Sequence, residues 1–201
     1  TALFIFATFP VCAADSPYLN LEEIVSLKSV RQAEMSPNGD AIAYVLSVPR
    51  KLYEDEDGPA YLQLHVVDLE GHSRAYFSGK VSVSDIAWSV DGNDIYFVGK
   101  RDLKADFSDI FKISLHGGEA EVVYQAKSAI KSITPSPDGK TIAFLAMDPA
   151  PADDKDVAEK GFKAQVYELA GQPLRVWRRA RDSGTAVAHD LKGSARGGDG
   201  A

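Results

Sequence analysis

The side chains that could perform covalent chemistry are few, and their spacing does not assemble a catalytic site. An α/β-hydrolase presents its nucleophilic serine in a G-x-S-x-G elbow between a strand and a helix. The nearest string is Gly193-Ser194-Ala195-Arg196-Gly197, in which the serine directly follows the first glycine. We therefore predict no catalytic residue. The histidines have no such serine to serve, and we expect surface or structural roles for His65, His72, His116 and His189.

The sequence also contains few groups of residues that could bind a metal ion. Cys12 is the single cysteine, so no intrachain disulfide and no cysteine-based zinc or iron–sulfur site can form. The densest group of acids is the run Glu54-Asp55-Glu56-Asp57. Adjacent carboxylates in a loop do not converge on an ion without further ligands, so we interpret the run as a solvated loop, with a cation site as the alternative. We predict neither a metal nor a cofactor.

Composition and charge restrict the class of protein and its partners. The 201 residues are 45% hydrophobic and 25% charged, as in a soluble globular protein. Lys and Arg number 22 and Asp and Glu number 29, a formal net charge of −7. This balance argues against general binding to nucleic-acid phosphates or to an anionic membrane surface, which both need basic patches.

One eleven-residue pattern organises the elements that would position any site. It recurs three times, at Met35–Val45, Trp88–Val98 and Pro135–Leu145, with the skeleton Ser-x-Asn/Asp-Gly-x-x-Ile. Asn-Gly or Asp-Gly followed by an alternating apolar run predicts a tight turn that leads into a strand. The structural turn glycines, expected at positive φ, are Gly39, Gly92 and Gly139.

The spacing of these turns predicts the blades of a β-propeller. The turn glycines lie 53 and 47 residues apart, which suits four-stranded blades. Ile86 and Trp88 should lie between stacked blades. We predict an all-β fold, a partial β-propeller of about three blades with WD40-like Ser-Pro-Asp-Gly turns in an incomplete ring. In the second repeat the expected strands are Val83–Trp88, Asp94–Lys100, Asp109–Leu115 and Glu119–Gln125.

The remaining segments follow from these repeats. A lead-in over residues 15–29 should contain a short helix within Asn20–Leu27, capped by Asn20, and a second helix is expected in Asp154–Lys160. Inserts at Pro49–Ala60 and Met147–Gln165 should form loops on one binding face. The propeller is expected over residues 30–195, with blades at about 30–80, 81–127 and 128–195, and a disordered tail over 196–201.

The end of the chain departs from the repeat. A third weak turn marker at Gly184 places the next Ser-Pro-Asp-Gly turn beyond residue 201, so a fourth blade is expected to begin as the sequence stops. Residues 169–201 carry a net charge of +3, against −10 for the residues before them. A truncated or frame-shifted sequence and a basic binding tail are the two explanations.

The first residues have the character of an export signal. Ala2–Ala14 is an uncharged apolar run, too short to span a bilayer, and Cys12-Ala13-Ala14 fits a cleavage site. We expect residues 1–14 to be a signal peptide and the mature protein to be periplasmic or secreted. Lipidation of Cys12 and a buried N-terminal strand are the alternatives.

These features together resemble a known family. The export signal, the three turns and the stretch Gly161-Phe162 followed by Val166-Tyr167-Glu168 are similar to the N-terminal portion of prolyl oligopeptidase family serine peptidases, of the acylaminoacyl-peptidase and dipeptidyl-peptidase type. The resemblance covers about residues 19–195. It implies a propeller of seven or eight blades over a C-terminal α/β-hydrolase domain that carries a Ser-Asp-His triad.

The resemblance also suggests one substrate-binding residue. In dipeptidyl-peptidase relatives a Val-Tyr-Glu-Glu string supplies carboxylates that hold the α-amino group of the peptide. Here the string reads Val166-Tyr167-Glu168-Leu169, so Glu168 is the candidate anchor and the second glutamate is replaced. A solvated acid at the end of an insert is the alternative for Glu168.

Two functions of different class follow. The first is the propeller portion of an exported serine peptidase, which restricts access to short peptide substrates and is inactive without its hydrolase domain. The alternative is a non-catalytic periplasmic propeller that binds protein partners, as the propeller of the Tol system does. A complete small interaction protein is a third hypothesis.

Overall fold

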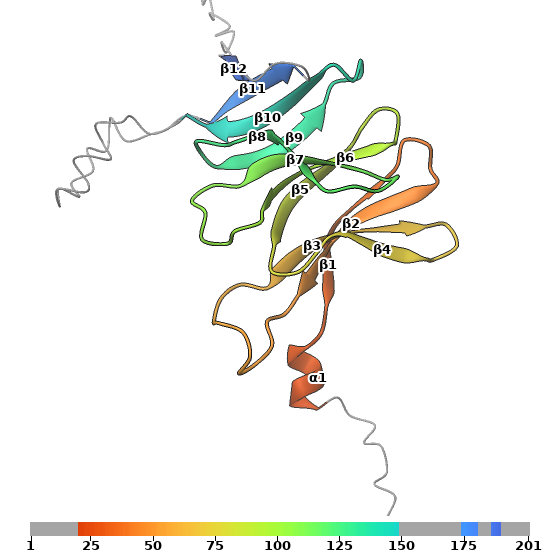
Figure 1. Ribbon diagram of the computed structural model, residues 1–201, viewed down its shortest axis with the longest axis vertical. Coiled ribbons are helices and arrows are strands. Elements are labelled where there is room, and N and C mark those ends of the chain that lie inside the picture. Colours follow the sequence, from red (N-terminus) through yellow and green to blue (C-terminus); the bar gives the residue numbers. More distant parts are fainter. Residues whose placement is uncertain (1–19, 149–173, 181–185, 190–201) are drawn as a thin grey trace, which may run out of the picture.

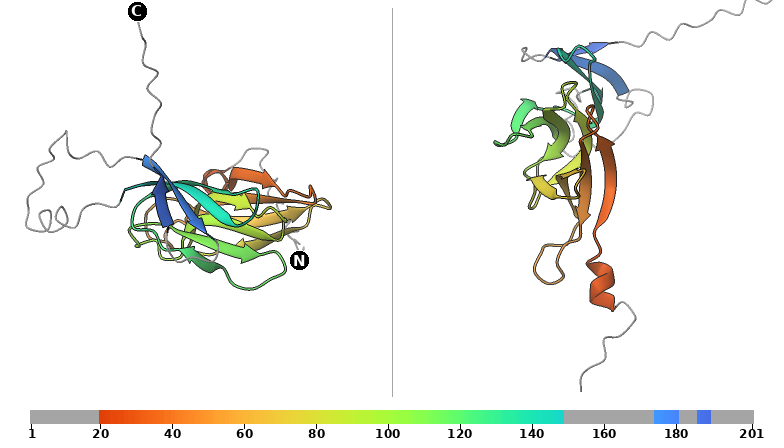
Figure 2. Two further views of the ribbon diagram at one scale, coloured as in Figure 1. Left: turned by 90° about the horizontal axis from the view of Figure 1, so that it is seen from above. Right: turned by 90° about the vertical axis from the view of Figure 1, so that its right-hand side faces the viewer.

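The computed structural model describes residues 20–148, 174–180 and 186–189. Within them, a short helix precedes three four-stranded antiparallel sheets, which follow one another in chain order along the long axis of the molecule (Figures 1 and 2). The predicted all-β fold of four-stranded blades is confirmed. The elements are α1 (Leu21–Val25), β1 (Ser29–Met35), β2 (Ala41–Val48), β3 (Tyr61–Asp68), β4 (Ser73–Phe77), β5 (Ser82–Trp88), β6 (Asp94–Lys100), β7 (Asp109–Ser114), β8 (Glu121–Tyr124), β9 (Ile130–Pro135), β10 (Thr141–Met147), β11 (Leu174–Ala180) and β12 (Ala186–His189).

We number the sheets blade 1 (β1–β4), blade 2 (β5–β8) and blade 3 (β9–β12). Each sheet is a meander in which consecutive strands pair, so the connections alternate between two ends of the blade. We call one the turn end; it carries the β1–β2, β5–β6 and β9–β10 turns at residues 36–40, 89–93 and 136–140 (Figure 1). The other is the loop end. It carries the connections at residues 49–60 and 101–108, and the described residues Asp148 and Leu174 on either side of the second insert.

The middle sheet is buried on both faces. Phe97 and Phe111 stack at 5.2 Å against blade 1, where Phe77 joins them, whereas Ile110 belongs to the core shared with blade 3. The alternation of apolar side chains along β7 therefore separates two apolar cores, rather than a core from solvent. Ile86, 1% exposed, lies between blades as predicted.

Hydrogen bonds between the first strands of successive blades lock the sheets together. Asp85 on β5 accepts from Gln32 Nε2 at 3.0 Å and from the backbone N of Ile133 at 2.8 Å. Trp88 Nε1 donates to the backbone oxygen of Glu34 at 2.9 Å. Three blades are thus joined through polar groups that would otherwise be buried without partners.

The described part of the lead-in contains the expected helix. Asn20 Oδ1 accepts from the backbone N of Glu23, and Glu23 Oε2 accepts from the backbone N of Asn20, each at 2.8 Å, which is a capping box. The helix spans Leu21–Val25, inside the predicted range Asn20–Leu27. In the part of the chain that the structure describes, no helix has the length and apolar character needed to cross a membrane. The signal segment and the helix expected at 154–160 lie outside the described residues.

Candidate functional surfaces at the two ends of the blades

The turn end is built from three copies of one serine-centred loop. In blade 1, Ser36 Oγ accepts from the backbone N of Asp40 and of Ala41, both at 3.1 Å, and donates to Asp40 Oδ1 at 2.6 Å. The serine therefore satisfies the loop amides that the short turn leaves open. Ser89 and Ser136 each accept from one backbone N, that of Asp94 or Thr141, and donate to an aspartate of the turn. In these two turns the preceding amide, of Asn93 or Lys140, donates to that aspartate instead. The glycine φ angles are 74° at Gly39, 72° at Gly92 and 66° at Gly139.

The position of the carboxylate differs between the turns. In blade 1 the serine bonds Asp40, which follows the glycine, whereas Ser89 in blade 2 bonds Asp91, which precedes it. Asn38, the residue before the glycine in blade 1, instead lies against blade 2. A Cβ at Gly92 would lie 2.8 Å from Asn38 Nδ2, so these two turns touch.

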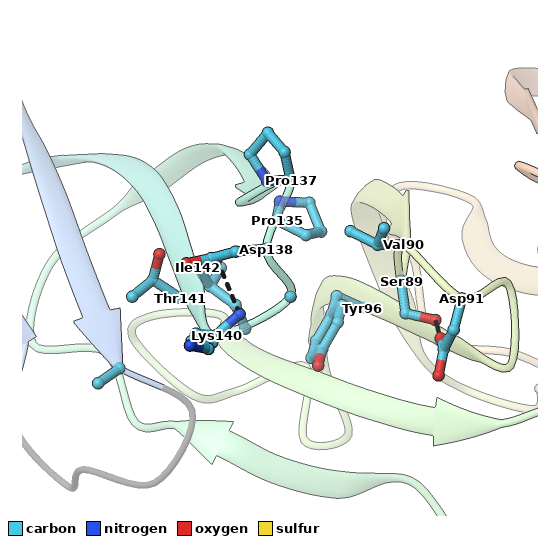
Figure 3. A pocket seen from close by; sticks show the side chains of 12 residues that line it. Ser89, Val90, Asp91, Tyr96, Pro135, Pro137, Asp138, Lys140, Thr141 and Ile142 are labelled. Carbon is cyan, nitrogen blue, oxygen red and sulfur yellow. Dashed lines mark hydrogen bonds between the residues drawn. The ribbon is translucent and has the colours of Figure 1, made fainter.

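The corresponding space between blades 2 and 3 is open. A Cβ at Gly139 would meet no atom within 4 Å. A cavity of about 690 Å³ lies here, with the turn of blade 2 on one side and the turn of blade 3 on the other (Figure 3). Its lining combines apolar and charged side chains, among them Val90, Asp91, Tyr96, Pro135, Pro137, Asp138, Lys140 and Ile142.

Both carboxylates in this cavity stay ionised at neutral pH. The Ser89 hydroxyl, followed by the backbone N–H of Asn93, lowers the pKa of Asp91. The Ser136 hydroxyl, followed by the backbone N–H of Lys140, lowers the pKa of Asp138. Hydrogen bonds to the charged form favour that form.

At the loop end, basic side chains hold the connections of blades 1 and 2, and in blade 3 Ser128 Oγ donates to the backbone oxygen of Met147. Arg50 donates to the backbone oxygens of Pro59 and Glu56, each at 2.8 Å, and its guanidinium lies 4.8 Å from the ring centroid of Tyr61. In blade 2, Lys100 Nζ donates to the backbone oxygen of Ala105 at 2.6 Å. Long cations reach across a wide connection where a serine hydroxyl would be too short.

The acidic run in this loop is not uniformly solvated, which corrects the expectation for its second member. Asp55 pairs with Lys80 Nζ at 2.8 Å, and its side chain is 11% exposed. The Lys80 ammonium, with the backbone N–H of Lys51, lowers the pKa of Asp55 to about 2. Glu54, Glu56 and Asp57 are exposed, as the interpretation requires.

The tip of the same loop presents apolar side chains to solvent. Tyr53 is fully exposed and has a φ of 64°, in the left-handed region that non-glycine residues rarely adopt. Leu52 beside it is 60% exposed. Because this conformation costs free energy and both side chains are exposed, the tip of the loop contributes little to the stability of this blade.

A second, smaller cavity lies at the loop end between blades 1 and 2. Its volume is about 350 Å³, and it adjoins the base of the first insert at Pro59 and Ala60. Arg31, Gln32 and Ser84 supply polar groups to it.

The second insert is anchored at its base, but its candidate residue is not described. Arg175 Nε donates to Asp148 Oδ2 at 2.6 Å, which joins the described residues on either side of the insert. Glu168, the predicted α-amino anchor, lies outside the described residues, so its position stays a prediction.

The histidines have varied surroundings. His65 stacks on Tyr44 at 5.4 Å, and burial lowers its pKa. His72 Nδ1 lies 3.2 Å from Asp68 Oδ2 and 3.5 Å from Glu70 Oε2. Within the described ranges, this is the one group of three side chains with metal-ligand geometry; all three are exposed, and we assign no metal to it. His189 ends β12.

Comparison with known proteins gives one curated relative. No family model matches the chain. An uncharacterized peptidase of Bacillus subtilis, YuxL, is 25% identical over 124 residues, which are 62% of this chain and 18% of that protein. The chain therefore spans less than a fifth of the length of this relative.

Solved structures match the fold more extensively. The AtxE2 isopeptidase has a TM-score of 0.63 at 12% identity, over 88% of this chain and 33% of its own. An acylaminoacyl peptidase of Pyrococcus horikoshii has a TM-score of 0.51 at 19% identity, over 66% and 19% of the two chains. A TolB of Acinetobacter baumannii matches 78% of this chain and 31% of its own at 14% identity, with a TM-score of 0.49. In fold, the chain matches the propeller portion of prolyl oligopeptidase family peptidases.

Proposed function

We propose that this chain is the propeller portion of an exported serine peptidase of the prolyl oligopeptidase family. The observation that carries the proposal is the superposition of its three sheets on the AtxE2 isopeptidase over 88% of the chain. The relation to a Bacillus peptidase supports it. No G-x-S-x-G elbow occurs in the 201 residues, so the triad would be supplied by a hydrolase domain, and the chain alone would be inactive.

In this proposal the loop end faces the substrate. Both inserts into the repeat connect strands at this end, and Glu168, just beyond the second insert in sequence, would hold the α-amino group of a short peptide. The Arg50 and Lys80 contacts fix the first insert in one conformation before any substrate arrives. A rigid entrance of this kind would exclude folded proteins and admit short peptides.

Export is a separate part of the proposal. It rests on the apolar run Ala2–Ala14 and on the small residues that precede Asp15. Mass spectrometry of the protein isolated from its native cells should find Asp15 as the first residue. Retention of the apolar run would contradict export by cleavage.

The coding sequence downstream of residue 201 tests the peptidase proposal. We expect a G-x-S-x-G elbow followed by an aspartate and a histidine, in that order. Further blades that end in a stop codon would overturn the proposal and favour a propeller that binds protein partners.

A further inference from the structure

The open groove at the turn end is not explained by the architecture of the repeat. The equivalent space between blades 1 and 2 is closed, because Asn38 reaches the glycine of the next turn. In blade 2 the residue at the same position is Asp91, and the Ser89 hydroxyl holds its carboxylate at 2.6 Å within its own turn. The change from Asn38 to Asp91 thus accompanies the difference between a closed and an open groove, together with the change from Pro37 to Val90.

The lining of this groove suits a cation on an aliphatic stem. Figure 3 shows Asp91 on one side and Asp138 on the other, with Pro135 and Tyr96 between them. Lysine and arginine side chains bury their methylene groups on apolar surface and keep the charged head beside polar groups. Lys140 also lines the cavity. The charges of Asp91, Asp138 and Lys140 therefore sum to −1, which still favours a cationic ligand.

We propose that this groove between blades 2 and 3 binds the lysine or arginine side chain of an extended peptide segment. Each turn contributes one aspartate to the lining, Asp91 or Asp138, and Val90 and Pro135 offer the apolar contact for the stem. The serine hydroxyls hold Asp91 and Asp138 in place before a ligand binds, so little ordering is needed. The site lies at the opposite end of the blades from the loop end, and it does not depend on the peptidase proposal.

Photo-crosslinking tests this site on the full protein in solution. The probe is the peptide acetyl-Gly-Lys-benzoylphenylalanine-Gly-amide, and the reference probe carries glutamate in place of lysine. We expect the lysine probe to label residues 89–93 and 136–142 in preference to the glutamate probe, and added salt to reduce the labelling. Equal labelling by both probes, or labelling elsewhere, would overturn the proposal.

Variants separate the groove from a general effect of charge. Asp91→Asn and Asp138→Asn should each reduce labelling by about threefold or more, since each removes one of the two carboxylates that line the groove. Asp40→Asn removes an equivalent serine-bonded carboxylate from the turn of blade 1, outside the groove, and should leave labelling unchanged. If all three variants weaken labelling equally, the site is not this groove.

A further variant guards against loss of structure. Val90 is 48% exposed, so Val90→Arg should fold normally while it places a guanidinium in the groove. We expect this variant to keep the thermal unfolding temperature of the parent and to lose the selective labelling. Selective labelling of a folded Val90→Arg protein would contradict the proposal.

Discussion

The two ends of the blades come from the same repeat but differ in the side chains that hold their connections. At the turn end, Ser36, Ser89 and Ser136 close three short loops with the same hydrogen bonds. At the loop end, the first insert is held by the cations Arg50 and Lys80 and exposes Tyr53 in a strained conformation. The polar groups of the turn end stabilise the turns themselves, whereas those of the loop end hold the conformation of an exposed loop.

The largest effect should come from the hydrogen bonds that join the blades and so support both ends. Asp85→Ala removes the acceptor for Ile133 N and Gln32 Nε2, and it should lower the free energy of unfolding by about 2 kcal/mol. Asp85→Asn keeps an oxygen that can accept from Ile133 N, so it should lower the free energy of unfolding by less. Urea denaturation measures the free energy of unfolding of both variants. Equal decreases would show that the hydrogen bond to Ile133 N does not determine the stability.

The second-largest effect on stability should come from a serine of the turn end. Ser89→Ala leaves the backbone N of Asp94 without its serine acceptor in a buried position, which should cost about 1–2 kcal/mol. Ser84→Ala changes an exposed serine on β5, the strand that precedes Ser89, and should change stability by less than about 0.5 kcal/mol. Similar losses for the two variants in thermal denaturation would remove the distinction between the turn serines and ordinary ones.

The loop end should respond in the opposite direction. Tyr53→Gly relieves the positive φ and removes no buried contact, so stability should stay equal or rise by up to about 1 kcal/mol. A clear loss of stability in urea would mean that Tyr53 contributes to the fold, and that the contrast between the ends is wrong.

The smallest effect concerns pH at the loop end. Because the folded pKa of Asp55 lies at about 2, below the ordinary value of 3.8, this carboxylate contributes stability above pH 4 and loses it as the pH falls toward 2. Lys80→Met should therefore flatten the acid limb of the stability curve. An unchanged acid limb in Lys80→Met would show that the pair does not set the pKa.

The sequence pattern predicted the fold better than it predicted the surfaces. Asn-Gly and Asp-Gly before alternating strands are local signals, so the four-stranded blades, Ile86 between them and the helix cap at Asn20 could be predicted. The role of Ser36, Ser89 and Ser136 was missed, although the serine recurs in every copy of the pattern and was the available signal.

Other features depend on contacts that no local pattern contains. Asp55 meets Lys80 from a loop 25 residues away, so the acidic run could not show which member is paired. The open groove depends on whether residue 38 or residue 91 reaches the next blade. The burial of β7 on both faces follows from its place in the middle sheet, which alternation alone cannot specify.

The most direct test of the central claim is fluorophosphonate labelling of the protein encoded by the complete gene. The account predicts that the reagent labels one serine, that this serine lies in a G-x-S-x-G elbow downstream of residue 201, and that labelling abolishes hydrolysis of short peptides. Failure of the full-length, folded protein to react with the reagent or to cleave any short peptide would contradict the assignment to a serine peptidase.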